Sequence, residues 1–412
     1  MPVLSNDLVQ GPLDEACVFL HSTDPQEGQS FREGHFRRSA IDRAMWLLLF
    51  FVFVPSCLSQ TEKIVSCYVR PENPPVEFID PFLCTHLMMI GSTSLNADGS
   101  ARMPDEELVR SVVSLKARNE QLKVFLTLLP PNPAMSALVT NKALLRAYVA
   151  NVTEFLMAND LDGFDVDWEF PVWSGDAKGT DKEGLSDLLR LFRRTFDSAP
   201  RRLDLSLAVS SPYTITKKAY DIHALNEFAD FVQIMNYDFH FFASNTPFTG
   251  LNAPLFPLKY EFLILKKFNS DFSTKFWVSN GLLPRKLVFG IPTYGRGFRL
   301  LSDKLHIPYS PAVGVSDRFG DFVTFSQVCE ALNSTEYTEE WSEHAKSPYF
   351  HGRKQWISHE NVQSVSIKGK HAREMDLGGI MLYDLFSDDF EGKCRFGDYP
   401  LIRAAKNSFL QQ

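Results

Sequence analysis

Leu161-Asp162-Gly163-Phe164-Asp165-Val166-Asp167-Trp168-Glu169-Phe170-Pro171 is the stretch that decides how the chain folds. It has the length and apolar content of a β-strand, in which successive side chains point to opposite faces. Asp165, Asp167 and Glu169 would then share one face. The other face would carry large apolar side chains that helices cover, namely Phe164, Val166 and Trp168. The stretch therefore predicts a buried strand that nevertheless carries three acids.

Three neighbouring carboxylates do not serve stability, because burying like charges together costs free energy unless protons or partners are supplied. Crowded carboxylates cannot all ionise, so one of them keeps its proton near neutral pH. Glu169 lies at the C-terminal end of the strand, where it would meet a substrate first and act as a general acid. Such acids can also bind Mg²⁺ or Ca²⁺. The apolar opposite face favours proton chemistry in a buried strand, and we expect no metal site and no cofactor.

Seven further apolar runs of similar length occur along the chain, several of them nearly continuous, as in strands that are buried on both faces. Together with the acidic stretch they make eight expected strands: Lys63–Val69, His86–Ser92, Leu122–Leu129, Leu161–Phe170, Leu203–Val209, Asp230–Tyr237, Lys286–Pro292 and Gly378–Asp384. Between them lie segments with helical spacing of apolar residues, the clearest being Ala137–Asn159 and Lys182–Ser198. This alternation predicts an α/β fold, a (β/α)8 TIM barrel, over residues 60–412.

One connection is too long for a single helix. Between Pro292 and Gly378 there are 85 residues, many of them aromatic. We expect a small α+β insertion at about residues 295–362, after strand seven and on the face where barrel active sites lie.

The N-terminal segment, residues 1–59, reads as an extension plus a signal peptide. A short apolar core at residues 46–54 follows several arginines and precedes the small residues Cys57 and Ser59. A membrane span needs about 20 apolar residues, which is more than this core has. We therefore expect cleavage near Ser59 and a secreted, extracellular protein. A retained signal anchor is the alternative, and residues 1–44 would be an upstream extension or a pro-region.

Four cysteines follow the expected cleavage point: Cys67, Cys84, Cys329 and Cys394. In a secreted chain they predict two disulfide bonds, for which spacing alone allows three connectivities. The triplets at residues 151–153 and 333–335 predict a glycoprotein. A net charge of −8 without a block of Lys or Arg argues against nucleic acid as a partner. We expect a monomer.

Residues 162–169, Asp-Gly-Phe-Asp-Val-Asp-Trp-Glu, match the DGxDxDxE signature of the family 18 glycoside hydrolases, the chitinases and their relatives. The resemblance extends over about residues 62–405. Residues 235–240 resemble the family's sixth-strand MxYD motif, and residues 290–298 resemble its seventh-strand GxPxYGRxF motif. Residues 66–68 with 84–86, and 377–381 with 388–390, resemble its first two strands and the end of its barrel. The resemblance pairs Cys67 with Cys84 and Cys329 with Cys394.

The resemblance implies retaining hydrolysis in which the substrate's own N-acetyl oxygen attacks the anomeric carbon. Glu169 would protonate the leaving oxygen and then activate water. Asp167 would hold the acetamido N–H, Asp165 would share a proton with Asp167, and Tyr237 would orient the acetamido oxygen. The implied substrate is chitin or an N-acetylglucosamine oligosaccharide. The residues expected to bind it are Tyr68, Met235, Asp238, Tyr294, Arg296 and Tyr383.

The chain also departs from the family pattern. The third strand ends in residues 127–133, Thr-Leu-Leu-Pro-Pro-Asn-Pro, in place of SxGG. Tyr383 stands where the eighth strand normally ends in Trp, and Phe170 replaces a Tyr that often follows the catalytic Glu. These changes favour a short or unusual substrate over crystalline chitin. We expect a secreted chitinase; the alternatives are a lectin that binds chito-oligosaccharides with little or no hydrolysis, and an endo-β-N-acetylglucosaminidase acting on N-glycan cores.

Overall fold

The computed structural model describes residues 62–411 except 71–72 and 97–99. The expected signal peptide and the extension before it lie outside the described residues. Among the residues that the structure describes, no helix is both long and apolar enough to cross a membrane.

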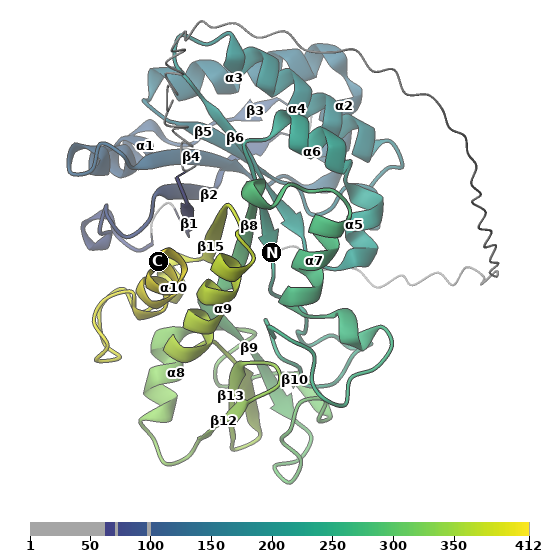
Figure 1. Cartoon of the computed structure of the whole chain (residues 1–412), viewed down its shortest axis with the longest axis vertical. Helices are drawn as coiled ribbons and strands as arrows, with labels where there is room; N and C mark the ends of the chain where they lie inside the picture. The colour runs from purple at the N-terminus through teal and green to yellow at the C-terminus, as the bar shows by residue number, and fades with distance from the viewer. Residues whose placement is uncertain (1–61, 71–72, 97–99, 412) are drawn as a thin grey trace, which may run out of the picture. The chain divides into compact units, whose positions relative to one another are not determined.

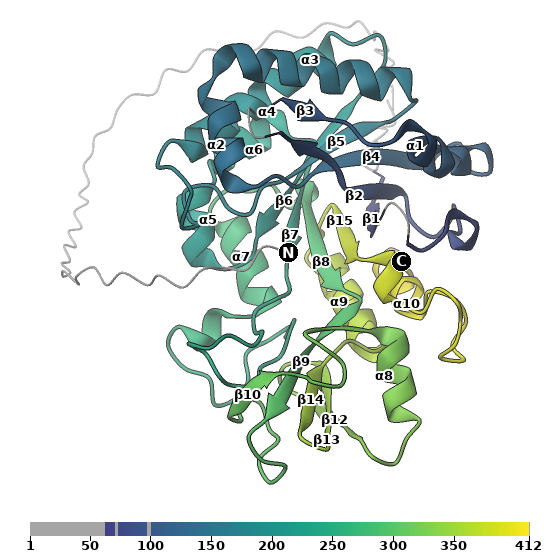
Figure 2. The same cartoon turned by 180° about the vertical axis from the view of Figure 1, so that it is seen from behind.

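Eight parallel strands form a closed barrel, which confirms the predicted fold (Figures 1 and 2). Each pairs with its successor, and the last pairs with the first, with Cys67 of β1 opposite Leu382 of β15. The barrel strands are β1 (Ile64–Val69), β2 (His86–Leu95), β4 (Lys123–Leu128), β5 (Gly163–Asp167), β6 (Asp204–Ser210), β7 (Phe231–Met235), β8 (Leu287–Pro292) and β15 (Gly379–Tyr383). A short strand, β3 (Ala101–Arg102), pairs antiparallel with the end of β2.

Helices surround the strands, as α3, α4 and α9 do in both views (Figures 1 and 2). The α-helices of the barrel are α1 (Glu106–Val113), α2 (Asn132–Thr140), α3 (Lys142–Ala158), α4 (Asp181–Asp197), α5 (Tyr213–Ala219), α6 (Ile222–Phe228), α7 (Ser270–Ser279), α9 (Val362–Glu374) and α10 (Pro400–Leu410). The 3₁₀ helices are η1 (Val76–Phe78), η2 (Ser114–Ala117), η3 (Leu265–Lys267), η4 (Pro284–Lys286) and η5 (Leu385–Ser387).

The prediction of a single helix over Ala137–Asn159 is wrong, because the helix is interrupted at Asn141. Asn141 adopts an extended conformation, and its side chain accepts hydrogen bonds from the backbone N–H groups of Ala143 and Leu144. An Asn in this role caps the start of a new helix. The region is therefore two helices, α2 and α3.

The insertion after the seventh barrel strand is confirmed as a small antiparallel sheet with one helix. Its elements are β9 (Tyr294–Leu300), β10 (Ala312–Val315), β11 (Phe322–Thr324), α8 (Phe325–Leu332), β12 (Thr338–Ser342), β13 (Ser347–Gly352) and β14 (Gln355–Ser358). It has its own apolar centre, in which Phe298, Tyr349 and Trp356 are buried. Figure 1 shows it beyond the end of β8.

Both disulfide bonds have the pairing that the family resemblance implied. Cys67 of β1 is bonded to Cys84, which lies just before β2. Cys329 of α8 is bonded to Cys394, which ties the insertion to the segment that leads into α10.

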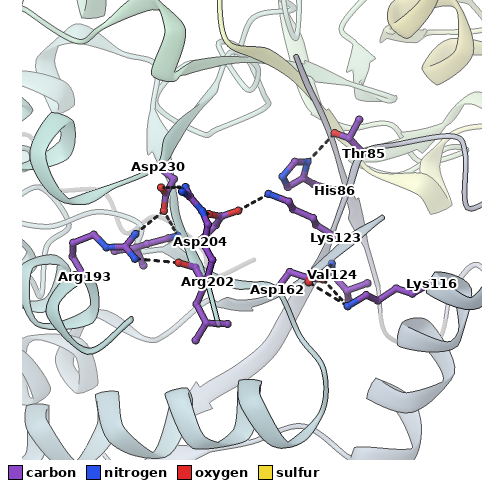
Figure 3. Close-up of polar contacts among 12 residues, drawn as sticks. Thr85, His86, Lys116, Lys123, Val124, Asp162, Arg193, Arg202, Asp204 and Asp230 are labelled. Carbon is purple, nitrogen blue, oxygen red and sulfur yellow. Dashed lines mark hydrogen bonds and ion pairs between the residues drawn. The ribbon is translucent and has the colours of Figure 1, made fainter. Parts of the chain in front are cut away.

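Acids at the amino-terminal ends of the barrel strands are paired with cations (Figure 3). The Asp204 carboxylate is 2.6 Å from Lys123 Nζ and 2.7 Å from Arg202 Nε. Asp230 is 2.9 Å from a guanidinium nitrogen of Arg193. Burial acts to raise the pKa of Asp204, but Lys123 and Arg202 outweigh burial and lower it. This end of the barrel is thus stabilised by charge pairing.

We predict that Asp204→Asn lowers the free energy of unfolding at pH 7 by roughly 2 kcal/mol, because Lys123 and Arg202 lose their common partner. The lowered pKa of Asp204 means that the stabilisation is present above the ordinary pKa of 3.8 and is lost as the pH falls through the folded-state value. Urea unfolding at pH 7 and at about pH 3 measures both effects.

The control is Asp187→Asn, which removes an exposed pair with Arg190 on α4 and should cost less than about 0.5 kcal/mol. Equal losses in the two variants would contradict the stabilising role of the amino-terminal network.

Candidate active site

The two faces of β5 have the character that the sequence predicts. Asp165 and Asp167 are buried within the barrel. Phe164 and Trp168 belong to the apolar core between strands and helices, and the Phe164 ring lies 4.9 Å from that of Phe192 in α4. The strand is shorter than predicted and ends at Asp167, so Glu169 lies just beyond it.

Asp165 is held by three side-chain donors. The hydroxyl of Tyr68 donates to one carboxylate oxygen at 2.7 Å. The other oxygen accepts from the Ser206 hydroxyl at 2.6 Å and from Gln233 Nε2 at 3.2 Å. Burial raises the pKa of Asp165, and these donors oppose the rise. The carboxyl group is thereby fixed in orientation.

Asp167 lacks such support. Its Oδ1 atom is buried and has no hydrogen-bond partner among the described residues. Burial, the Glu169 carboxylate and the Asp165 carboxylate, in that order, raise the pKa of Asp167 well above its ordinary value. The group therefore favours its protonated form, or a ligand that donates a hydrogen bond to it.

Glu169 is half-buried at the end of this row of acids. Burial first, and then the negative charge of Asp238, raise its pKa to about 7. A carboxyl group with this pKa is protonated in a large fraction of molecules at neutral pH. Glu169 can accordingly donate a proton under conditions in which an ordinary glutamate cannot.

Asn132 holds the backbone next to Glu169, and sequence analysis missed it. Its Nδ2 donates to the carbonyl oxygen of Glu169 at 2.9 Å, and its Oδ1 accepts from Trp168 Nε1 at 2.6 Å. The Ser174 hydroxyl donates to the same carbonyl at 3.2 Å. These bonds replace strand pairing at this point, which explains why β5 ends early. Asn132 comes from the segment 127–133 that departs from the family pattern, and only its polarity among prolines could have signalled it.

Ser206 and Gln233 were missed as well. Both are polar residues inside runs that are otherwise apolar, and this is the signal that could have found them. Gln233 also donates to the Tyr68 hydroxyl at 3.0 Å and accepts from the Ser66 hydroxyl at 2.6 Å. The two residues complete a buried polar network around Asp165.

Four tyrosines predicted for the site form one aromatic cluster. The Tyr383 ring centroid lies 5.5 Å from that of Tyr68, 5.7 Å from Tyr237 and 6.0 Å from Tyr294. The Tyr237 hydroxyl has a weak partner, the Met381 sulfur at 3.8 Å. Met235 packs at the edge of this cluster.

Asp238 and Arg296 form the charged part of the site. Arg296 Nε donates to Asp238 Oδ1 at 2.7 Å, and the same guanidinium pairs with Asp321 of the insertion. Asp238 has a left-handed backbone with φ 58°, and its N–H donates to Asn252 Oδ1 at 3.0 Å. The structure thus brings the sequence-predicted site residues together at the carboxyl ends of the strands.

No group of three or more His, Cys, Asp or Glu residues in the described ranges is arranged to hold a metal ion.

Comparison with known proteins gives a consistent result. The family model for glycosyl hydrolases family 18 matches residues 64–388. Chitotriosidase-1 of Mus musculus is 31% identical over 339 residues, which are 80% of this chain and 72% of that protein. A group IV chitinase of Ostrinia furnacalis superposes with a TM-score of 0.79 at 30% identity, over 85% of this chain and 100% of that one.

Ligand complexes and a non-catalytic protein are also among the similar structures. One Ostrinia furnacalis structure is a complex with allosamidin. Human YKL-39 is described as a pseudo-chitinase with retained chitooligosaccharide binding, and it superposes with a TM-score of 0.77 at 26% identity, over 84% of this chain and 99% of that one.

We predict that Glu169 titrates near pH 7 in the folded protein and that Asp238→Asn measurably lowers the pKa of Glu169, because a neighbouring negative charge is removed. Carboxyl ¹³C NMR of labelled glutamates measures the titration, and the signal that disappears in Glu169→Gln identifies the residue.

Glu343→Gln, at an exposed ion pair with Lys346, is the control and should leave the Glu169 titration unchanged. A Glu169 pKa near 4.5, or one that does not respond to Asp238→Asn, would refute this account of the site electrostatics.

Proposed function

The chain belongs to glycosyl hydrolase family 18, and from this premise we propose that it hydrolyses β-1,4 linkages between N-acetylglucosamine units of chitin or chito-oligosaccharides. One observation carries the proposal. Glu169, a carboxyl group whose pKa is raised to about 7, lies just beyond a strand that carries two buried aspartates. A proton donor beside a pair of buried carboxyl groups is what substrate-assisted, retaining hydrolysis requires.

In the proposed reaction Glu169 supplies and then recovers the proton. Its protonated carboxyl donates to the glycosidic oxygen as the bond to the anomeric carbon breaks. The acetamido oxygen of the substrate forms the new bond to that carbon, so no side chain of the protein becomes covalently attached. The Glu169 carboxylate then takes a proton from water. The water oxygen bonds to the same carbon as the bond to the acetamido oxygen breaks, which restores the acetamido group and releases the sugar with retained configuration.

Asp167 and Asp165 act as a pair in this proposal. The unpartnered Oδ1 of Asp167 is available to accept a hydrogen bond from the acetamido N–H, which carries positive charge as the ring forms. Asp165 stays fixed by Tyr68, Ser206 and Gln233 and shares a proton with Asp167. The pair thus holds the acetamido group in the orientation that attack needs.

The remaining predicted residues hold the sugar. The weak partner of the Tyr237 hydroxyl, the Met381 sulfur, leaves it able to donate to the acetamido oxygen. Tyr383 offers a ring face of smaller area than the usual Trp. Asp238 and Arg296 present a fixed acceptor and donors for sugar hydroxyls, with Met235, Tyr68 and Tyr294 packed around them.

The second candidate function is binding of chito-oligosaccharides without hydrolysis. The observation in its favour is the altered surface on both sides of the acids, namely Tyr383 in the eighth strand and the proline-rich segment 127–133. Human YKL-39 gives a precedent for a pseudo-chitinase with this architecture.

We also propose that the protein is secreted and glycosylated. Two disulfide bonds are typical of oxidising compartments. Asn151 on α3 and Asn333 after α8 are both exposed, as glycan acceptors must be.

We predict that Glu169→Gln reduces the kcat for hydrolysis of defined chito-oligosaccharides by about 10³-fold or more, because the proton donor is lost while the shape of the side chain remains. Wild-type activity should fall as the pH rises through about 7, since Glu169 loses its proton there. Chromatography of the products and the pH–rate profile measure both effects.

Glu183→Gln, at an exposed position on α4, serves as the control and should keep wild-type activity. Similar turnover in Glu169→Gln and the wild type would exclude the mechanism. Oligosaccharide binding by both forms without cleavage would favour the lectin function. Cleavage of N-glycan cores but not of chito-oligosaccharides would change the substrate class and leave the chemistry unaltered.

A further inference from the structure

Lysine and aromatic side chains lie together on the surface made by α5, α7, η3 and the segment that follows β5. We call this surface the lysine–aromatic patch. Its members are Lys217, Lys218, Lys267, Trp173, Tyr213, Phe272 and Phe276. In the sequence the lysines belong to two separate Lys-Lys pairs, and the fold brings these pairs to one place because α5 packs beside α7 (Figures 1 and 2).

Each of these lysines lies over at least one aromatic ring. Lys267 Nζ lies 4.5 Å from the Tyr213 ring centroid, and Lys217 Nζ lies 6.0 Å from the same centroid. Lys218 Nζ lies 5.0 Å from the centroid of Trp173, whose side chain is exposed. The ammonium groups are thus positioned by the rings and keep their positive charge toward solvent.

No ion pair involves these three lysines, nor the adjacent Lys182 and Lys266, within the part of the chain that the structure describes. The nearby acids have other partners. Asp221 accepts hydrogen bonds from two backbone N–H groups at the start of α6. Asp271 pairs with Lys275 and His371. The patch is therefore a local excess of positive charge on a chain whose net charge is −8.

A hollow of about 350 Å³ opens beside the patch. Lys217 and Phe276 belong to both. The wall of the hollow also carries the polar side chains of Lys182, Thr216, Tyr220, Asp221, His223 and Asn280. The two lysines outnumber the one carboxylate, Asp221, so the wall has an excess of positive charge that suits the anionic group of a ligand.

The patch is distinct from the candidate active site but borders it. Trp173 follows β5, and α5 begins directly after β6, so both lie at the carboxyl-terminal end of the barrel. None of its members belongs to the row of acids or to the tyrosine cluster. A saccharide chain bound to the patch would therefore not need to contact the Glu169 carboxyl.

We propose that the lysine–aromatic patch is a second binding site, for linear saccharide chains that carry sulfate or carboxylate groups. The partly exposed rings offer apolar surface on which sugar rings can pack, and the ammonium groups beside them pair with the anionic substituents. This combination fits a charged saccharide better than a neutral chito-oligosaccharide, which would gain little from unpaired lysines. The site does not depend on hydrolysis by Glu169.

The test measures binding to the full chain carrying Glu169→Gln, so that no probe is cleaved. The probes are a sulfated hexasaccharide of alternating glucosamine and uronic acid, its desulfated N-acetylated form, which keeps the carboxylates, chitohexaose, and single-stranded DNA of equal charge. The test variant is Lys217→Gln/Lys218→Gln/Lys267→Gln. The matched control is Lys142→Gln/Lys304→Gln/Lys354→Gln, which removes the same charge at three exposed lysines elsewhere.

We expect the test variant to bind the anionic saccharides about tenfold or more weakly, and the control to remain within about twofold of the parent. Affinity of the parent should fall as salt rises. Chitohexaose binding should be equal in all three proteins, and replacing the same three lysines by arginine should preserve binding. Comparison of the sulfated and desulfated probes shows which anionic group is recognised.

Equal weakening in the test and control variants would overturn the proposal, because net charge alone would then explain binding. The proposal would also be overturned if the DNA bound more tightly than either anionic saccharide and its binding depended on the three lysines. The patch would then be assigned to nucleic acid. An absence of anionic saccharide binding at about 50 mM salt, where charge attraction is strong, would likewise overturn the proposal. The lysines would in that case serve only to pack α5 against α7.

Discussion

The alternation of side chains along β5 is the constraint on which the rest of the structure depends. Asp165 lies opposite Thr127 of β4 and Ser206 of β6, and this register turns the acids inward and Phe164 outward. Because the period of a strand is two, a slip of one residue would place the acids among the helices. Closure of the barrel prevents that slip, since both neighbours of β5 are themselves paired on their far sides.

Aspartates have opposite environments at the two ends of the barrel. At the amino-terminal end, Asp204 has two cationic partners and a lowered pKa. At the carboxyl-terminal end, Asp167 has an unpartnered oxygen and a pKa raised well above its ordinary value. The pairing of Asp204 stabilises the folded protein. The environment of Asp167 destabilises it, as is typical of groups whose pKa is shifted at functional sites. Since the two sets of residues share no side chain, each end keeps its own electrostatics.

Much of the architecture follows from local pattern, because apolar runs and their spacing are properties of the sequence itself. All eight predicted runs overlap a barrel strand, and the long gap after Pro292 contains the insertion. The break at Asn141 could not be seen, since helical periodicity continues through it. Sequence analysis missed the roles of Asn132, Ser206 and Gln233 because these roles depend on neighbours that are distant in the sequence. The roles of Glu169 and its partners in catalysis stay predictions; what the structure adds is their proximity and environment.

The separation of the Asp204 ion pairs from Glu169 has a consequence for how this protein can change over evolutionary time. A lineage that replaces Glu169 by a neutral residue removes a carboxyl group that burial disfavours, and it leaves the Asp204 network intact. Loss of turnover would then cost nothing in folding and could even add stability. Substitutions at the opposite end of the barrel, by contrast, meet selection against unfolding.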